Sequence, residues 1–191
     1  MADSILALKT ILCHEVGNTG DGLVDDPDDP GGITKYGVSF RFLKDHGIDV
    51  DGDGDIDAED IRGLNPEETA KLYKQFFWNL VHGDDFADQA VATKLFDMAV
   101  NMGPGKAIKL AQASAGVPDD GIFGPKTFRA LNVTGDAVQP LLTSICSTQV
   151  GFYRGIVMAR PKSQKFLAGW LVRANCTLAT PCRTCRAFLK G

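Results

Sequence analysis

Residues 86–103 read FADQAVATKLFDMAVNMG, and this stretch sets the fold class that we expect for the chain. Its apolar residues recur at the three- and four-residue spacing of one helix face, and Gly103 ends the pattern. Pro104 opens a second helical pattern at once, and that pattern ends at Gly116. Two helices separated only by a Gly-Pro break predict a mainly α architecture.

The rest of the chain continues with short helices and short connections. Further helices are expected over residues 3–16, 38–46, 65–80, 136–159 and 162–175, with one more that begins at Pro125. Residues 17–37 are rich in Gly, Asp and Pro, which predicts tight turns and a small β-hairpin near residues 20–37. No longer strand pattern occurs, so the expected fold stays mainly α.

The net charge is −4, but the charges are distributed unevenly along the 191 residues. Residues 1–60 hold 15 acids and 4 bases, whereas residues 137–191 hold 8 bases and no acid. A basic rear of this kind indicates either an anionic partner, such as cell wall, membrane surface or nucleic acid, or an ordinary solvated face. No run of about 18 apolar residues occurs, so no membrane-spanning segment is expected.

The N-terminal segment MADSILALKTILCHEVG has neither a cationic start nor a small-residue cleavage site. We therefore expect it to be an amphipathic helix of the mature protein. This interpretation predicts synthesis in the cytoplasm without a signal peptide. A monomer is the default expectation.

The five cysteines are an odd number. Cys13 and Cys146 fall in apolar helical patterns, and we expect both to be buried thiols. Cys176, Cys182 and Cys185 gather in the tail, where the last two form a C-x-x-C motif. Three states stay open for the tail: free thiols, a disulfide formed after export, or half of a zinc site for which the sequence shows no second C-x-x-C or His pair.

Residues 49–60, DVDGDGDIDAED, hold six aspartates and one glutamate. An EF-hand calcium loop has oxygen ligands at alternate positions and Gly at position 6, which is Gly54 here. The expected metal ligands are Asp49, Asp51, Asp53, Asp55 and Asp60. We expect a structural Ca²⁺ that joins helix 38–46 to the helix near Asn65, and a solvated acidic loop is the alternative. A single loop of this kind predicts a clip rather than a switch.

A single glutamate closes the first expected helix. Glu15 lies on the apolar stripe at the helix C-terminus, where the helix dipole and burial both favour the protonated acid. A glycosidase needs such a neutral acid to protonate a leaving sugar oxygen. The following loop offers Asp25, Asp26, Asp28 and Asp29 as candidates for an ionised partner. Thr34 could position an attacking water, and a solvated surface glutamate is the alternative.

Several stretches, in the same order, resemble glycoside hydrolase family 108, the lysozyme-like N-acetylmuramidases of phage endolysins and secretion-associated systems. They include HEVG, DDPDDPGGITKYGVS, NPEETAKLYKQFFWN and LFDMAVNMGPGKAIKLAQ. DGIFGPKTFRAL, FYRGIV and FLAGWLVRA resemble the peptidoglycan-binding domain that follows in such proteins. The resemblance implies a lysozyme-like two-lobed fold, with a catalytic lobe over residues 1–90 that carries the EF-hand-like loop 49–60, and a helical peptidoglycan-binding lobe over residues 91–191.

Matched by position, the resemblance implies that Glu15 is the catalytic acid, Asp29 its carboxylate partner and Thr34 the residue that orients water. Val16 replaces the first glycine of the family's E-G-G motif, and the loop after Glu15 is longer than in the family pattern. The longer loop leaves the choice among Asp26, Asp28 and Asp29 open. A separation of about 6.5–9.5 Å between the carboxyl groups would give inversion, which we expect by analogy with phage lysozymes.

Three further residues are candidates for substrate binding. Asp97 and Asn101 lie four residues apart on one expected helix face, which the resemblance places along the cleft. For Asn101, helix capping or packing is the alternative. Trp78 belongs to an aromatic run that either stacks on sugar or packs in the core. Arg173 is expected to meet peptidoglycan carboxylates or to form an intramolecular ion pair.

The reaction implied by the resemblance is hydrolysis of the β-1,4 bond between N-acetylmuramic acid and N-acetylglucosamine in peptidoglycan. It needs no cofactor for catalysis. The basic rear would then contact the anionic cell envelope, no nucleic-acid partner is expected, and the enzyme would act on the wall after release. Two alternatives stay open: a lytic transglycosylase that leaves 1,6-anhydro sugars, and a non-catalytic, calcium-dependent wall-binding module.

Overall fold

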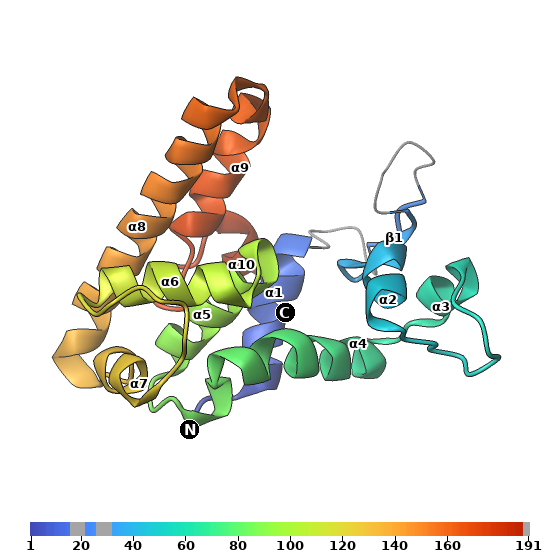
Figure 1. The fold of residues 1–191 in the computed structure, drawn as a ribbon, viewed down its shortest axis with the longest axis horizontal. Coiled ribbons are helices and arrows are strands. Elements are labelled where there is room, and N and C mark those ends of the chain that lie inside the picture. The colour runs from blue at the N-terminus through green and yellow to red at the C-terminus, as the bar shows by residue number, and fades with distance from the viewer. Residues whose placement is uncertain (16–21, 26–31, 189–191) are drawn as a thin grey trace.

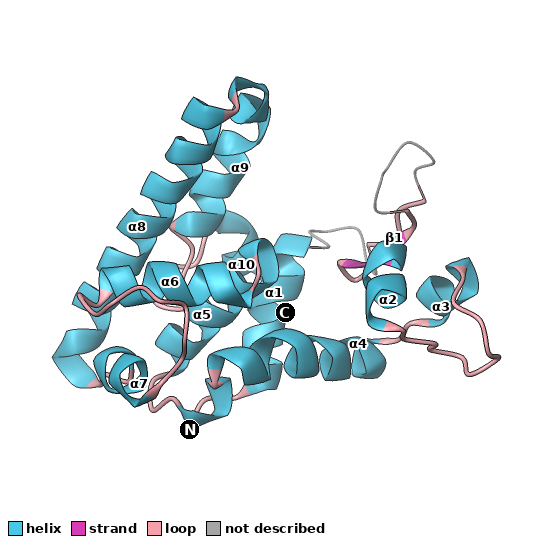
Figure 2. Ribbon diagram, in the orientation of Figure 1, coloured by secondary structure: helices cyan, strands magenta, loops and turns pink. Residues whose placement is uncertain are grey.

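The computed structural model describes residues 1–15, 22–25 and 32–188, and this part of the chain is built mostly of helices (Figure 2). The α-helices are α1 (Ser4–Glu15), α2 (Phe40–His46), α3 (Ala58–Gly63), α4 (Pro66–Tyr73), α5 (Gln89–Met102), α6 (Pro104–Ser114), α7 (Pro125–Leu131), α8 (Val138–Ala159), α9 (Gln164–Ala174) and α10 (Arg183–Phe188). A π-helical turn, Lys74–Trp78, extends α4, and short 3₁₀ turns occupy Asn79–Val81, Gly83–Asp85, Gly135–Ala137 and Pro161–Ser163. The mainly α prediction is confirmed. Among the described helices, none combines the length and the apolar character needed to cross a membrane.

A small antiparallel sheet lies between α1 and α2 in the chain. β1 (Thr34–Lys35) pairs with β2 (Val38–Ser39). An isolated bridge also joins Val24 to Thr34. The two residues of the turn, Tyr36 and Gly37, have positive φ angles of 51° and 79°, which match the right-handed twist of a two-residue hairpin. The predicted small hairpin is therefore confirmed, at the downstream end of the region where it was expected.

Helix α5 is the centre of the hydrophobic core. Residues 91–99 are all buried, because α1, α6 and α8 pack around this helix. Asp88 caps its N-terminus by accepting the N–H groups of Ala90 and Val91. Gly103, with a φ of 83°, ends it, and Pro104 starts α6, as the sequence predicts. A helix enclosed on all sides can carry polar residues only where each finds a partner.

Lys94 shows how the core satisfies a buried charge. Its side chain is 1% exposed. The ammonium Nζ donates to the backbone oxygens of Arg173, Ala174 and Cys176 at 3.3, 2.6 and 3.4 Å. The first two oxygens belong to the last two residues of α9, where the helix dipole places partial negative charge, and the third follows the helix. Lys94 therefore fixes the C-terminal end of α9 against α5.

The helices form two lobes of unequal size (Figure 1). The small lobe holds β1, β2, α2 and α3, and the large lobe holds α5 to α10. Helix α4 runs from beneath the small lobe into the large one, and α1 lies between the two (Figure 1). The mainly α, lysozyme-like fold agrees with what the resemblance implies, and this arrangement places the end of α1 at the junction of the lobes.

The aspartate-rich loop connects to the next helices differently from the sequence prediction. It leads into α3, a short helix whose N-cap Asp57 accepts the N–H of Glu59. Helix α4 begins only afterwards, at Pro66. Asn65, a residue type that favours the N-cap, forms a capping box with Glu68. The loop thus joins α2 to α3, both in the small lobe.

Candidate active site

A cavity of about 270 Å³ opens between the lobes. Its lining comes from the end of α1, the β-hairpin, α2, α4 with its π-helical extension, α5 and α9. The residues are Glu15, Gly37, Val38, Ser39, Phe42, Leu72, Tyr73, Phe77, Val100, Asn101 and Arg173. Glu15 is the single carboxylate in this lining as far as the described residues go. The first catalytic candidate from the sequence therefore faces the site.

Arg173 of α9 holds the Glu15 side chain in place. Its Nη1 donates to Glu15 Oε1 at 2.8 Å, across 158 residues of sequence. The Glu15 side chain is 23% exposed and that of Arg173 is 12% exposed. Of the two expectations for Arg173, the intramolecular ion pair is confirmed. A helix of the large lobe thus fixes the terminal residue of α1 at the cavity wall.

Asp97 completes this ion-pair group from the side away from the cavity. The Nε of Arg173 donates to Asp97 Oδ1 at 2.9 Å, and the Asp97 side chain is only 4% exposed. Burial acts to lower the pKa of Arg173, but the carboxylates of Asp97 and Glu15 outweigh it, so the pKa is raised. Arg173 Nη2 and Asp97 Oδ2 are buried without a hydrogen-bond partner in the described part of the chain. The guanidinium stays charged and bridges two carboxylates from two other helices.

Gly37 lets the hairpin approach Glu15 closely. A Cβ on this residue would lie 2.5 Å from the Tyr73 hydroxyl and 2.9 Å from Glu15 Cβ. The Tyr73 hydroxyl donates to the backbone oxygen of Tyr36 at 3.0 Å. Burial, and then the charge of Glu15, raise the pKa of Tyr73, so the hydroxyl keeps its proton. The hairpin, α1 and α4 therefore meet at one point where only glycine fits.

Comparison with known proteins assigns a family to this site. Residues 8–103 match the family model described as glycosyl hydrolase 108, and residues 106–175 match the one described as a predicted peptidoglycan domain. The chain belongs to glycosyl hydrolase family 108. It is a glycoside hydrolase, a muramidase that hydrolyses peptidoglycan.

Two further comparisons bear on the muramidase. A solved structure of Brucella abortus SagA has the same fold, with a TM-score of 0.70 and 24% sequence identity over 98% of this chain and 94% of that one. A search of the curated proteins finds no match. The two family models meet between residues 103 and 106, at the break between α5 and α6. The division into lobes over residues 1–90 and 91–191 stays a prediction.

The three predicted substrate residues of the muramidase have different positions. Asn101 lines the cavity, and its Oδ1 accepts a hydrogen bond from the Tyr153 hydroxyl. Asp97 does not reach the cavity, because Arg173 lies in front of it and takes up its Oδ1. The substrate-binding prediction for Asp97 is therefore corrected: this residue holds Arg173.

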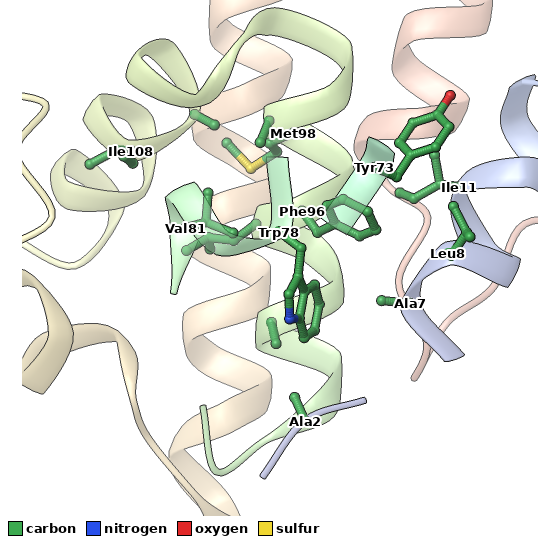
Figure 3. Close-up of a cluster of buried hydrophobic side chains, with 14 of the residues drawn as sticks. Ala2, Ala7, Leu8, Ile11, Tyr73, Trp78, Val81, Phe96, Met98 and Ile108 are labelled. Atoms are coloured by element: carbon green, nitrogen blue, oxygen red, sulfur yellow. The ribbon is translucent and has the colours of Figure 1, made fainter. Parts of the chain in front are cut away.

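Trp78 belongs to the core. Its side chain is fully buried, and its ring stands edge-on to Phe96 at 5.3 Å (Figure 3). The indole Nε1 donates to Asp84 Oδ1 at 2.7 Å, which satisfies its one donor. The prediction that Trp78 contacts sugar is wrong, and the core-packing alternative holds. Phe42, Tyr73 and Phe77 are the aromatic residues of the cavity instead.

Of the four predicted carboxylate partners of Glu15, the structure describes only one. Asp26, Asp28 and Asp29 lie outside the described residues. Asp25 is described, and it pairs with Arg62 of α3 at 3.0 Å, away from the cavity lining. Thr34 lies in β1, where its hydroxyl donates to the backbone oxygen of Gly32 at 3.3 Å. Thr34 is not part of the described lining, so its role stays a prediction.

The aspartate-rich loop lies outside this site, in the small lobe. Asp49, Asp51 and Asp53 bring one carboxylate oxygen each within 4.8 Å of one another. The charge of Asp53 is the largest of the influences that raise the pKa of Asp55. Asp60 is different, because it is 1% exposed and its two oxygens accept the N–H groups of Val50, Asp51 and Asp57. The structure thus groups three of the five predicted metal ligands and gives Asp60 backbone partners.

The cysteines correct one prediction. Cys13 is not a thiol, because it forms a disulfide with Cys185 across 172 residues. Cys146, Cys176 and Cys182 are free. Burial raises the pKa of Cys176 to about 12, so it stays a neutral thiol at pH 7. The tail is therefore tied to α1, one residue before His14 and two before Glu15.

Sequence reasoning missed Gly37, Tyr73 and the Arg173–Glu15 contact as parts of the site. A local signal existed for Gly37, because it belongs to the stretch ITKYGVS. No local signal could join Arg173 to Glu15, because the pair depends on how α9 packs against α1 and α5.

Proposed function

We propose that Glu15 protonates the leaving oxygen when the enzyme hydrolyses the β-1,4 bond between N-acetylmuramic acid and N-acetylglucosamine. The observation that supports this role is its place in the interlobe cavity, where Arg173 fixes one carboxylate oxygen and the other has no hydrogen-bond partner among the described residues. Gly37 and Tyr73 enclose the base of the same side chain. A rigidly held carboxyl group beside a sugar-sized cavity suits general acid catalysis, in which it acts in its protonated form rather than as the ionised partner of Arg173.

A second carboxylate and a water complete the proposed reaction. Asp29 is the proposed partner, with Asp26 and Asp28 as the neighbouring candidates. Thr34 is proposed to orient the water, because β1 leads from this segment to the cavity-lining residues Gly37 and Val38. We expect an inverting reaction, for which the two carboxyl groups stand about 6.5–9.5 Å apart with water between them.

Sugar contacts are proposed for the open face of the cavity. Asn101 offers its amide N–H groups, since its oxygen already accepts the Tyr153 hydroxyl. Phe42 and Phe77 also line the cavity, and their rings would give an apolar surface for the sugar ring. These residues come from both lobes, so substrate would bind across the junction.

Mass spectrometry of digested peptidoglycan tests the reaction. Purified wall incubated with wild-type enzyme should release muropeptides with reducing N-acetylmuramic acid ends, each one water heavier than a 1,6-anhydro product. Anhydro ends would establish the transglycosylase alternative. Glu15→Gln should release neither product, and Glu67→Gln, on an exposed ion pair with Lys71, is the matched control that should digest normally. Release by Glu15→Gln at the wild-type rate would show that Glu15 is not the catalytic acid.

We also propose that the loop at residues 49–60 binds one structural Ca²⁺. Asp49, Asp51 and Asp53 converge within 4.8 Å, and their carboxylates are the hard oxygen ligands that calcium prefers, of which it takes about six to eight in all. Asp55 would add its backbone oxygen, and Asp60 would have to exchange backbone N–H partners to ligate. The ion would offset the repulsion that now raises the pKa of Asp55. No catalytic step passes through this ion.

The basic C-terminal region, residues 137–191, presents one prominent surface in this fold. Helices α8 and α9 form a hairpin whose tip projects away from the rest of the large lobe (Figure 1). Exposed bases gather around this tip at Arg154, Arg160, Lys162 and Lys165. We propose that the tip contacts the anionic envelope once the enzyme has been released from the cytoplasm. Sedimentation with purified wall should then weaken with rising salt, and no change with salt would contradict this contact.

A further inference from the structure

The C-terminal segment meets α1 in a cluster of sulfur and nitrogen atoms. Cys13 and His14 come from α1. Cys185 lies in α10, and Cys182 is the residue directly before that helix. One ligand atom from each of the four residues lies within 4.8 Å of the others. Cys185 Sγ and His14 Nε2 are 3.6 Å apart. Four metal-ligating side chains from the two ends of the chain thus point at one another.

This set of atoms has the composition of a structural zinc site. Three thiolates and one imidazole are a common zinc donor set, and C-x-x-C is its usual half motif. Tetrahedral zinc with bonds of about 2.0–2.3 Å places its ligand atoms roughly 3.5–3.8 Å apart, so the observed cluster needs only a small contraction. The bonded sulfurs of Cys13 and Cys185 would have to separate. The second half of the motif, Cys13 and His14, lies almost 170 residues upstream.

The surroundings of the cluster also suit a metal. Cys13 and Cys185 are 2% and 0% exposed, and His14 and Cys182 are half-buried. The backbone N–H of Cys182 donates to Cys176 Sγ at 3.2 Å, which orients the C-x-x-C turn. The site is therefore shielded from water and held from both sides.

We propose that the reduced chain binds one Zn²⁺ through Cys13, His14, Cys182 and Cys185. Reduction of the Cys13–Cys185 disulfide gives two thiols. A thiol reductant supplies two electrons and two protons and becomes a disulfide, whereas a phosphine supplies two electrons and becomes its oxide, with water providing the two protons and the oxygen. Binding of Zn²⁺ by three thiols and one neutral imidazole then releases three protons. The disulfide and the metal exclude each other, so zinc ties α10 to α1 in a reducing compartment and the disulfide ties them in an oxidising one. In both states the tie sits two residues before Glu15.

Metal titration of the full chain tests this site. Protein reduced with a phosphine and saturated with Ca²⁺ should bind one zinc ion per chain in native mass spectrometry. Co²⁺ in place of zinc should give the strong visible bands of tetrahedral coordination and a sulfur-to-cobalt charge-transfer band. The carboxylates of residues 49–60 cannot give that sulfur band. A reduced, folded chain without zinc, or cobalt without the sulfur band, would overturn the proposal.

Single variants assign the ligands. Cys182→Ser leaves the Cys13–Cys185 disulfide available, so it can fold under oxidising conditions before reduction. It should lower zinc affinity more than about 100-fold, because a four-ligand site becomes a three-ligand site. Cys146→Ser, which lies outside the cluster, should bind zinc like wild type. Equal affinity of Cys182→Ser and Cys146→Ser would contradict the site.

Cys176 provides the remaining comparison. His14→Ala should lose zinc as Cys182→Ser does, whereas Cys176→Ser should weaken binding by about 10-fold at most, since it removes only an outer hydrogen-bond acceptor. The opposite order, with Cys176→Ser losing zinc and His14→Ala keeping it, would replace His14 by Cys176 and refute the ligand set. These readings do not depend on hydrolytic activity, so they fail or succeed separately from the role of Glu15.

Discussion

The Glu15 site and the aspartate-rich loop are both acidic, but they are held in opposite ways. Glu15 is positioned by residues from distant parts of the chain: Gly37 in the hairpin, Tyr73 in α4 and Arg173 in α9. The loop is shaped by its own backbone, because Asp49 accepts the N–H groups of Gly52 and Gly54 and Asp60 accepts three more. One site depends on the fold of the whole chain, and the other on a dozen consecutive residues.

This difference explains why the loop dominates the sequence and the active site does not. A local structure must encode its contacts in consecutive residues, so it produces a recognisable motif. A site assembled from several helices needs only one suitable side chain from each. Changes at the Glu15 site should therefore affect folding and catalysis together, whereas changes in the loop should affect the stability of the small lobe alone.

The largest effect is expected for Arg173→Met. The substitution leaves Asp97 and Glu15 as partly or fully buried carboxylates without a cation, which typically costs about 3–5 kcal/mol in unfolding free energy. Urea denaturation measures this loss. Arg154→Met, at an exposed position of α8, is the control and should change stability by less than about 0.5 kcal/mol. Equal effects of the two variants would show that the ion pairs do not stabilise the packing of α1 and α5 against α9.

Two glycines with almost equal φ angles allow a direct comparison of the Glu15 site with the aspartate-rich loop. Gly37 and Gly52 have φ angles of +79° and +78°, but a Cβ would clash only at Gly37, against Tyr73 and Glu15. Alanine at either position should cost about 1–2 kcal/mol for the left-handed backbone. Gly37→Ala should add about 1–3 kcal/mol for overpacking and should also lower the turnover rate, whereas Gly52→Ala should leave it unchanged. Melting curves and wall-clearing rates of both variants provide the measurement.

Calcium removal should have an intermediate effect, confined to stability. If the loop binds Ca²⁺, an ion concentration 100-fold above the dissociation constant adds about 2.7 kcal/mol, which corresponds to a rise in Tm of about 5–10 °C for a chain of this size. A chelator should reverse this rise, and Asp45→Asn, in an exposed ion pair outside the loop, should not. A Tm that is the same with calcium and with chelator would show that the loop binds no stabilising Ca²⁺.

The smallest effect is expected at Asn101. Asn101→Ala removes amide donors from the cavity wall, and we expect KM to rise about fivefold, equivalent to about 1 kcal/mol of a single hydrogen bond. The value of kcat should change little, because this contact holds the ground state and the transition state alike. Gln139→Ala, at an exposed position of α8 outside the cavity, is the control. A fall in kcat with constant KM would instead give Asn101 a part in the reaction itself.

The sequence predicts the local features of this molecule well. The Gly103–Pro104 break, the Asn65 cap of α4 and the mainly α class all follow from residues within one or two turns of each other. Glu15 also emerges, because it ends an amphipathic stripe. The sequence does not predict the Cys13–Cys185 and Arg173–Glu15 contacts, because pairs separated by 172 and 158 residues are determined by packing. The sugar-contact prediction for Trp78 fails for a related reason, because an aromatic run has the same sequence whether its rings contact sugar or pack against Phe96.

The rate of peptidoglycan hydrolysis by Glu15→Gln and by Asp49→Asn, each measured per folded molecule, tests the central claim most directly. Glutamine keeps an oxygen for Arg173 but cannot donate the proton, so Glu15→Gln should be slower than wild type by about 10²–10⁴-fold. Asp49→Asn should hydrolyse within about twofold of wild type, even where its melting temperature falls. Hydrolysis by Glu15→Gln near the wild-type rate, or an equal loss in Asp49→Asn, would contradict the assignment of chemistry to the cavity and of support to the loop.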